Sequence, residues 1–300
     1  MRADFSPRDE QLWAACNSNS DMRALLLALA FALCAPCADI PHRIVSLSPD
    51  LTEILYGVGA FHRVVGVSDF DTYPPEVAKL PRLGQLNNPS LERLTGLRPD
   101  LVVINIAQAP FLEDELKDLG LRILTASNRS IQEVYSAMQT IGRATGNDKE
   151  AARLVAVTRE GLDRVGRRTA GLAKPRVAMI VDRTPGTLRD LYAATDGGYL
   201  AELVAIAGGR MALPPVEGGY EKLSKEDLLA ANPDIILDLV QGPTGRFSGD
   251  PLEAWREMPE LKAVREHRVR DVTEDYVPHA SQRIVQTAEL FARLIHPEIH

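Results

Sequence analysis

The stretch Ser90-Leu-Glu-Arg-Leu-Thr-Gly-Leu-Arg-Pro-Asp-Leu-Val-Val-Ile104 has the pattern of a capped helix that leads into a buried strand. A similar stretch returns later in the chain as Ser224-Lys-Glu-Asp-Leu-Leu-Ala-Ala-Asn-Pro-Asp-Ile-Ile-Leu237. When the two Pro-Asp pairs are aligned, Glu92 falls on Glu226 at an offset of 134 residues, and the capping serines keep the same offset. The repeat predicts two copies of one helix–strand unit.

Short β-branched runs alternate with amphipathic stretches around both copies, a pattern typical of parallel sheets covered by helices. At 300 residues and 45% hydrophobic content, the chain is long enough for two cores. We predict an α/β protein with two similar lobes, 39–147 and 173–300, each built on a parallel-rich sheet. The expected strands lie at 43–48, 63–67, 101–105 and 122–126, then at 176–182, 191–194, 235–239 and 269–272, with helices at 49–57 and 281–295.

The segment 148–172 between the lobes is predicted to be one long helix over most of its length. Its apolar residues have helical spacing, and it contains no proline. Acids near its start and bases near its end complement the helix dipole. A helix of this length spans about 30 Å. We therefore expect a rigid joint between the lobes, with a ligand cleft between them.

Residues 1–38 have the features of a leader. An arginine precedes an apolar run that ends in small residues, which is the shape of a secretory signal peptide and too short to span a bilayer. Met22 is the expected start, and Cys16, Cys34 and Cys37 all fall within the leader, so the processed chain would fold without a disulfide. We expect export to the periplasm. A buried N-terminal helix and a lipid-anchored cysteine are the alternatives.

Charge and motifs argue against two classes of function. The formal charge of −7 is spread along the chain without a basic or acidic block, so nucleic acid is not an expected partner. The rival class is a soluble α/β enzyme, but neither Gly-x-Gly-x-x-Gly nor Gly-x-Ser-x-Gly occurs in the sequence. We predict a binding protein with no catalytic residues and no intrinsic cofactor.

Several motifs taken together resemble the helical-backbone substrate-binding proteins of ABC importers, which carry cobalamin, haem and ferric siderophores to an inner-membrane permease. The resemblance covers essentially the whole chain after the leader, and Ser-Pro-x-x-Thr-Glu at 48–53 and Tyr-Pro-Pro at 73–75 are nearest to the cobalamin-binding branch. It rests on 43–55, 67–75, the two repeated stretches and the long helix between them.

The resemblance implies that Glu92 and Glu226 pair with arginines of the permease dimer, and that the protein acts as a monomer. The simpler explanation is that each glutamate follows an N-capping serine, where an acid stabilises a helix start by about 0.3–1 kcal/mol. That explanation accounts for an acid at each position, but not for the equal spacing in both lobes.

Ligand-binding residues are expected where strands end and helices begin, because ligands of open α/β sheets lie beyond the carboxyl ends of the strands. Tyr73 is the strongest candidate, since an aromatic face with a polar tip suits a large planar ligand. The full set is Ser48, Asp50, Asp69, Tyr73, Leu86, Asn87 and Asn105 in the first lobe, and Arg183, Tyr199, Tyr220, Gln241, Tyr276 and His279 in the second.

Three of these residues have ordinary alternative roles. Tyr73 could instead be a loop tyrosine that packs under Pro74 and Pro75. Arg183 would suit a carboxylate or phosphate on the ligand, but a lone arginine is often salt-bridged. His279 could ligate a metal, but a single loop histidine is commonly solvated.

Among the family's ligands, a corrinoid such as cobalamin is expected, with a ferric siderophore as the alternative. The segment 83–88 has neither the tyrosine of haem-binding relatives nor the aromatic residue of cobalamin-binding ones, which counts most strongly against haem. Direct Zn²⁺ or Mn²⁺ binding is not expected, because the six histidines show no paired spacing.

Overall fold

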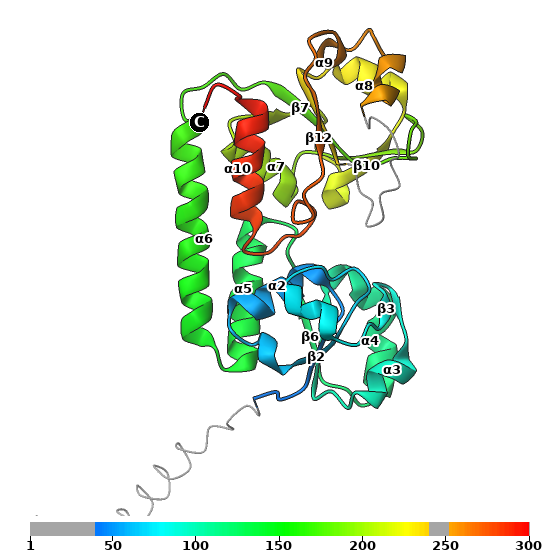
Figure 1. Ribbon diagram of the computed structural model, residues 1–300, viewed down its shortest axis with the longest axis vertical. Coiled ribbons are helices and arrows are strands. Elements are labelled where there is room, and N and C mark those ends of the chain that lie inside the picture. The colour runs from blue at the N-terminus through cyan, green and yellow to red at the C-terminus, as the bar shows by residue number, and fades with distance from the viewer. Residues whose placement is uncertain (1–39, 240–251, 300) are drawn as a thin grey trace, which may run out of the picture. The chain divides into compact units, whose positions relative to one another are not determined.

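The computed structural model describes residues 40–239 and 252–299 (Figure 1). The predicted leader and Gln241 lie outside the described residues. Both predicted sheets are present, and most of their strands begin and end within a residue or two of the predicted positions.

The first sheet is entirely parallel. It contains β1 (Ile44–Ser46), β2 (Val64–Val67), β5 (Leu101–Asn105) and β6 (Ile123–Ala126) in the order β2-β1-β5-β6. Because side chains alternate across a strand, the two faces of this sheet belong to two different apolar clusters. Ile44 and Val103 point into one cluster, and Val45 and Val102 point into the other.

Four helices accompany this sheet: α2 (Pro49–Gly57), α3 (Leu91–Gly96), α4 (Ala109–Asp118) and α5 (Ile131–Thr145). Helices α2 and α5 contribute apolar residues to one cluster, while α3 and α4 contribute to the other, so the sheet is covered on both faces. Between β2 and α3 the chain forms a short hairpin, β3 (Gly84–Gln85) and β4 (Asn88–Pro89).

The second sheet is mixed. Strands β7 (Arg176–Asp182), β11 (Ile235–Leu239) and β12 (Val269–Val272) run parallel, whereas β8 (Leu191–Ala194) is antiparallel to both β7 and β10 (Tyr220–Leu223). The order is β10-β8-β7-β11-β12, and β9 (Arg210–Met211) also pairs with β7. Its helices are α7 (Tyr199–Ile206), α8 (Lys225–Ala231), α9 (Lys262–Arg265) and α10 (Ile284–Ile295).

The predicted long helix is α6 (Asp148–Thr169), with 22 residues. It lies against α5 from the first half of the chain and against α7 and α10 from the second (Figure 1). Glycines allow these close contacts: a Cβ on Gly161 would come within 2.7 Å of Val285 in α10, and one on Gly142 in α5 within 2.3 Å of Ala151. In the described parts of the chain, no helix combines the length and the apolar character needed to cross a membrane.

The repeated helix–strand unit is present in both halves of the chain. In each copy the helix, α3 or α8, leads into a strand, β5 or β11, that pairs in parallel with the first strand of its own sheet. The aspartate of each Pro-Asp pair has the same structural role in both copies. The Asp100 carboxylate accepts the backbone N–H of Arg43 at 2.9 Å, and the Asp234 carboxylate accepts that of Arg176 at 2.7 Å. Each aspartate thus fixes the start of the neighbouring strand.

Candidate functional site

Polar side chains from three strand ends of the first sheet meet at Asp50. This residue lies in the first turn of α2, just after β1, and is only 8% exposed. Its carboxylate accepts hydrogen bonds from Ser48 Oγ, from Asn105 Nδ2 at 3.0 Å and from Asn128 Nδ2. The predicted convergence of Ser48, Asp50 and Asn105 is therefore present. Sequence reasoning missed Asn128, although it follows β6 and the same strand-end argument applies to it.

The loop that follows β2 is held by hydrogen bonds from its own residues and from the β3–β4 hairpin. Ser68 donates to Asp71 Oδ2 through its backbone N–H at 3.0 Å and its hydroxyl at 2.6 Å. Asp69 Oδ1 accepts the backbone N–H of Gly84 at 3.1 Å, and Arg82 donates to the carbonyls of Ser68 and Asp71. These hydrogen bonds hold the loop 68–71 in place, and this loop is called the platform below.

Within this platform, Asp71 is 2% exposed, and its Oδ1 has no hydrogen-bond partner among the described residues. Burial raises the pKa of the Asp71 carboxyl to about 6, against the opposing effect of the hydrogen bonds from Ser68.

Leu86 and Asn87 form the turn of the β3–β4 hairpin, where Leu86 is half-buried and Asn87 exposed. Gln108, which follows β5, donates to the Leu86 carbonyl at 2.6 Å and to the Leu47 carbonyl at 2.9 Å. The hairpin turn is thereby tied to the strand ends at which the other candidates lie.

Aromatic residues occur in the segments that follow β2 and β5. Tyr73 is half-buried, and its ring meets that of Tyr56 edge-on, with 5.5 Å between centroids. Phe70, in the same loop, is 39% exposed, and Phe111, in the first turn of α4, is 56% exposed. Both phenylalanines were missed, although exposed aromatic residues just beyond strand ends are a signal that the sequence carries.

Arg183 does not lie where a ligand could use it. Its side chain is 2% exposed, and its guanidinium pairs with the fully buried Asp238 of β11, with 2.9 Å between Nη2 and Oδ2. Nη1 also donates to the Thr187 carbonyl at 3.0 Å, and Trp255 Nε1 donates to Asp238 at 2.7 Å. The expectation of a ligand-binding arginine is corrected accordingly, because a buried carboxylate inside the sheet needs this cation.

Tyr199 is likewise a core residue rather than a surface one. It is 7% exposed, and its hydroxyl donates to the Val277 carbonyl at 3.3 Å. Burial raises the pKa of its phenol well above the ordinary value. Tyr220, in contrast, is half-buried, and its ring stacks on that of Tyr192, which is 43% exposed, with centroids 6.1 Å apart.

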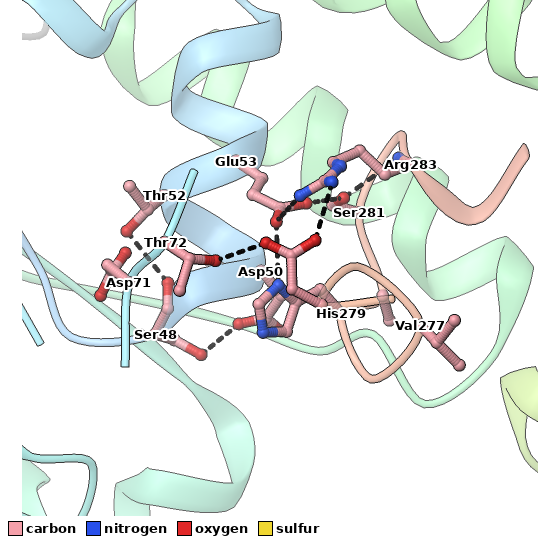
Figure 2. Close-up of polar contacts among 12 residues, drawn as sticks. Ser48, Asp50, Thr52, Glu53, Asp71, Thr72, Val277, His279, Ser281 and Arg283 are labelled. Carbon is pink, nitrogen blue, oxygen red and sulfur yellow. Dashed lines mark hydrogen bonds and ion pairs between the residues drawn. The ribbon is translucent and has the colours of Figure 1, made fainter. Parts of the chain in front are cut away.

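The last two candidates, Tyr276 and His279, lie in the segment that precedes α10, and this segment contacts α2. Figure 2 shows the buried Glu53 of α2 surrounded by side chains from this segment. His279 Nδ1 lies 2.9 Å from Glu53 Oε1, and Arg283 Nη1 lies 3.0 Å from the same atom. Burial opposes the charged imidazolium, but the Glu53 hydrogen bond and charge outweigh it, so the pKa of His279 is raised.

His279 is therefore an ion-pair partner of Glu53. Within residues 40–239 and 252–299, no group of three or more His, Cys, Asp or Glu side chains is arranged to hold a metal ion.

The two glutamates of the repeat occupy equivalent, exposed positions in the first turns of α3 and α8. The preceding serine caps each helix: Ser90 accepts from the Arg93 N–H, and Ser224 forms a capping box with Asp227. Among the described residues, neither the Glu92 nor the Glu226 carboxylate has a hydrogen bond or an ion pair. The caps do not need these carboxylates, which are free to meet another molecule.

Comparisons with known proteins identify the family of this chain. Residues 44–276 match the family described as periplasmic binding protein. An uncharacterised ABC transporter substrate-binding lipoprotein, YvrC of Bacillus subtilis, is 30% identical over 263 residues, which cover 86% of this chain and 81% of that protein. The chain therefore belongs to the periplasmic binding protein family, whose members bind substrates for transport and are not enzymes.

Two further relatives differ in what their names say they bind. The vitamin B12-binding protein of Vibrio cholerae is 24% identical over 248 residues, covering 82% of this chain and 86% of its own length. The crystal structure of a possible iron-binding periplasmic solute-binding protein from Staphylococcus epidermidis is similar with a TM-score of 0.72 at 28% identity, covering 85% of this chain and 99% of that one.

Proposed function

We propose that this protein is the periplasmic substrate-binding component of an ABC importer and that it carries a corrinoid, cobalamin or a close relative. The observation that carries the proposal is the set of aromatic rings beyond the strand ends. Tyr73, Phe70 and Phe111 follow strands of the first sheet, and Tyr276 and Tyr220 belong to the second half. A corrin ring offers a broad apolar surface with amide groups at its rim, and tyrosines match both features.

A polar network at the strand ends of the first sheet suits a neutral, hydrogen-bonding ligand. Asp50, Asn105 and Asn128 are joined by hydrogen bonds and are buried or half-buried, so their side chains are held in place. Arg183, the cation expected to meet an anionic group, is held by Asp238. The relatives named as vitamin B12-binding support the same ligand class.

A ferric siderophore is the second candidate, and the 28% identical iron-binding relative favours it. Haem is a poorer candidate, because the β3–β4 hairpin turn, Leu86–Asn87, holds no side chain that ligates haem iron.

The permease is proposed to dock on Glu92 and Glu226. Their equivalent exposed positions at two helix starts give a permease dimer two matching acidic contacts. The protein would reach this partner as a monomer in the periplasm, after removal of residues 1–38.

The test is calorimetric titration with cyanocobalamin, cobinamide, haemin and ferric catecholates and hydroxamates. We expect the corrinoids to bind most tightly, and Tyr73→Ala to weaken them about five- to 150-fold, the scale of losing about 1–3 kcal/mol of buried aromatic contact.

Leu119→Ala is the control, because Leu119 is a large apolar residue, 44% exposed, that follows the carboxyl end of α4, away from the strand ends that carry the rings. The chelate affinity of Leu119→Ala should stay within about twofold of that of the unaltered protein. Failure of every chelate to bind below about 10 μM would refute the function, and an unchanged affinity of Tyr73→Ala would refute the site.

A further inference from the structure

A fully buried carboxylate connects the first half of the chain to the segment that precedes α10. Glu53 lies in α2 with 0% of its surface exposed. Its side chain accepts from Arg283 Nη1 at 3.0 Å, contacts His279 Nδ1 at 2.9 Å and accepts from Ser281 Oγ. These partners lie at least 226 residues further along the chain. A buried carboxylate is stable only when it is paired and hydrogen-bonded, so Glu53 needs the Arg283 guanidinium.

Arg283 is held on its other sides as well. Its Nη2 donates to Asp275 Oδ1 at 3.2 Å, and Asp275 accepts the Thr72 hydroxyl at 2.9 Å through its second oxygen. Thr72 belongs to the loop after β2, so the guanidinium bridges the same two parts of the chain as Glu53 does.

The rings of two proposed ligand tyrosines pack on this guanidinium. Arg283 Cζ lies 4.5 Å from the centroid of the Tyr73 ring and 4.9 Å from that of the Tyr276 ring. Both distances are within the range of cation–π attraction, which is strongest when the cation is desolvated, and the Arg283 side chain is only 13% exposed. One planar cation thus sets the positions of two rings that come from different halves of the protein.

We propose that Arg283 is a positioning residue for ligand binding: it holds Tyr73 and Tyr276 in register, and Glu53 fixes Arg283. The proposal rests on the function proposed above, in which both tyrosines contact the chelate. Ligand affinity then depends on Arg283 without a direct contact, because rings that are already ordered lose less conformational entropy on binding.

Arg283→Lys is the central test, since lysine keeps the charge but cannot stack as a plane on two rings while bonding two carboxylates. We expect it to weaken binding of the best chelate of the panel about tenfold, for two rings that must be ordered anew. Arg164→Gln is the control. Arg164 is exposed on α6, with its side chain at 58%, and its loss should leave the affinity within about twofold.

A second measurement needs no ligand. In protein labelled with 3-fluorotyrosine and assigned by single Tyr→Phe changes, the ¹⁹F resonances of Tyr73 and Tyr276 should shift in Arg283→Lys and stay in place in Arg164→Gln. A variant that lost only the Arg283 cation would leave the Glu53 carboxylate buried without a partner and could fail to fold. Glu53→Gln/Arg283→Gln removes both charges together, so it avoids this problem and should give the same ring shifts.

Ring resonances that do not move in Arg283→Lys would overturn the positioning role. Resonances that move while chelate affinity stays within twofold would overturn its importance for binding. If no chelate binds the unaltered protein, the proposed function fails, and the ring resonances alone then decide whether Arg283 orders the two tyrosines.

Discussion

Replacing Arg183 with methionine is the sharpest test of whether this residue serves the fold or the ligand. Arg183→Met removes the cation that pairs with Asp238, whose side chain is 0% exposed. Asp238 would lose the guanidinium and keep the hydrogen bond from Trp255 Nε1 at 2.7 Å. Breaking one partner of a buried pair costs about 3–5 kcal/mol, because the remaining charge stays buried. A loss of that size lowers the melting temperature by on the order of 10 °C.

The matched control is Lys222→Met, which removes the cation from an ion pair with Asp190. That pair is 2.7 Å long, against 2.9 Å for the buried pair, but its side chains are 70% and 65% exposed. Water replaces an exposed partner, so the expected cost is below about 1 kcal/mol. Arg183→Met/Asp238→Leu removes both buried charges and should recover most of the stability lost in the single variant.

Urea unfolding followed by circular dichroism measures the stabilities, and calorimetry measures chelate affinity of the folded fraction. We expect Arg183→Met to be destabilised with its affinity nearly unchanged. A variant that keeps its stability within 1 kcal/mol but loses affinity would show that Arg183 binds the ligand, and would refute the reasoning from burial.

Three further predictions concern docking, motion and pH. Glu92→Lys/Glu226→Lys should cut ligand-stimulated transport while leaving chelate affinity within about twofold; normal transport in this variant would argue against docking at these residues. Because α6 packs along both halves of the chain, small-angle scattering should change little when ligand is added, and a compaction of several per cent would contradict the rigid joint. The folded pKa of Asp71, about 6, is above the usual 3.8, so the folded state binds the extra proton between these values and loses stability as pH rises through them, by up to about 3 kcal/mol. Unfolding at pH 4 and pH 7 should show this loss in the natural protein and not in Asp71→Asn, and equal pH profiles would count against a raised pKa.

Local patterns in the sequence determined most of the elements that carry the site. The apolar runs Leu101–Asn105 and Ile235–Leu239 are strands with those bounds, because each follows a Pro-Asp pair that ends the preceding helix and ties the neighbouring strand. The helix predicted from Asp148 begins there, since apolar spacing and charge order are properties of a short stretch of chain. Asp50 and Asn105 meet for a similarly general reason: carboxyl ends of adjacent parallel strands share one edge.

The partners of the charged residues were decided only by the tertiary structure. Arg183 was expected at the ligand because it follows the predicted strand 176–182 and would suit a carboxylate or phosphate. Its partner Asp238 is 55 residues away, inside a strand whose other residues are apolar. Glu53 belonged to a motif that was noticed, but its partners His279, Ser281 and Arg283 lie more than 220 residues further on. Periodicity reports which face of an element is buried, whereas the pairing of buried charges depends on which distant elements share that interior, and no local pattern encodes this.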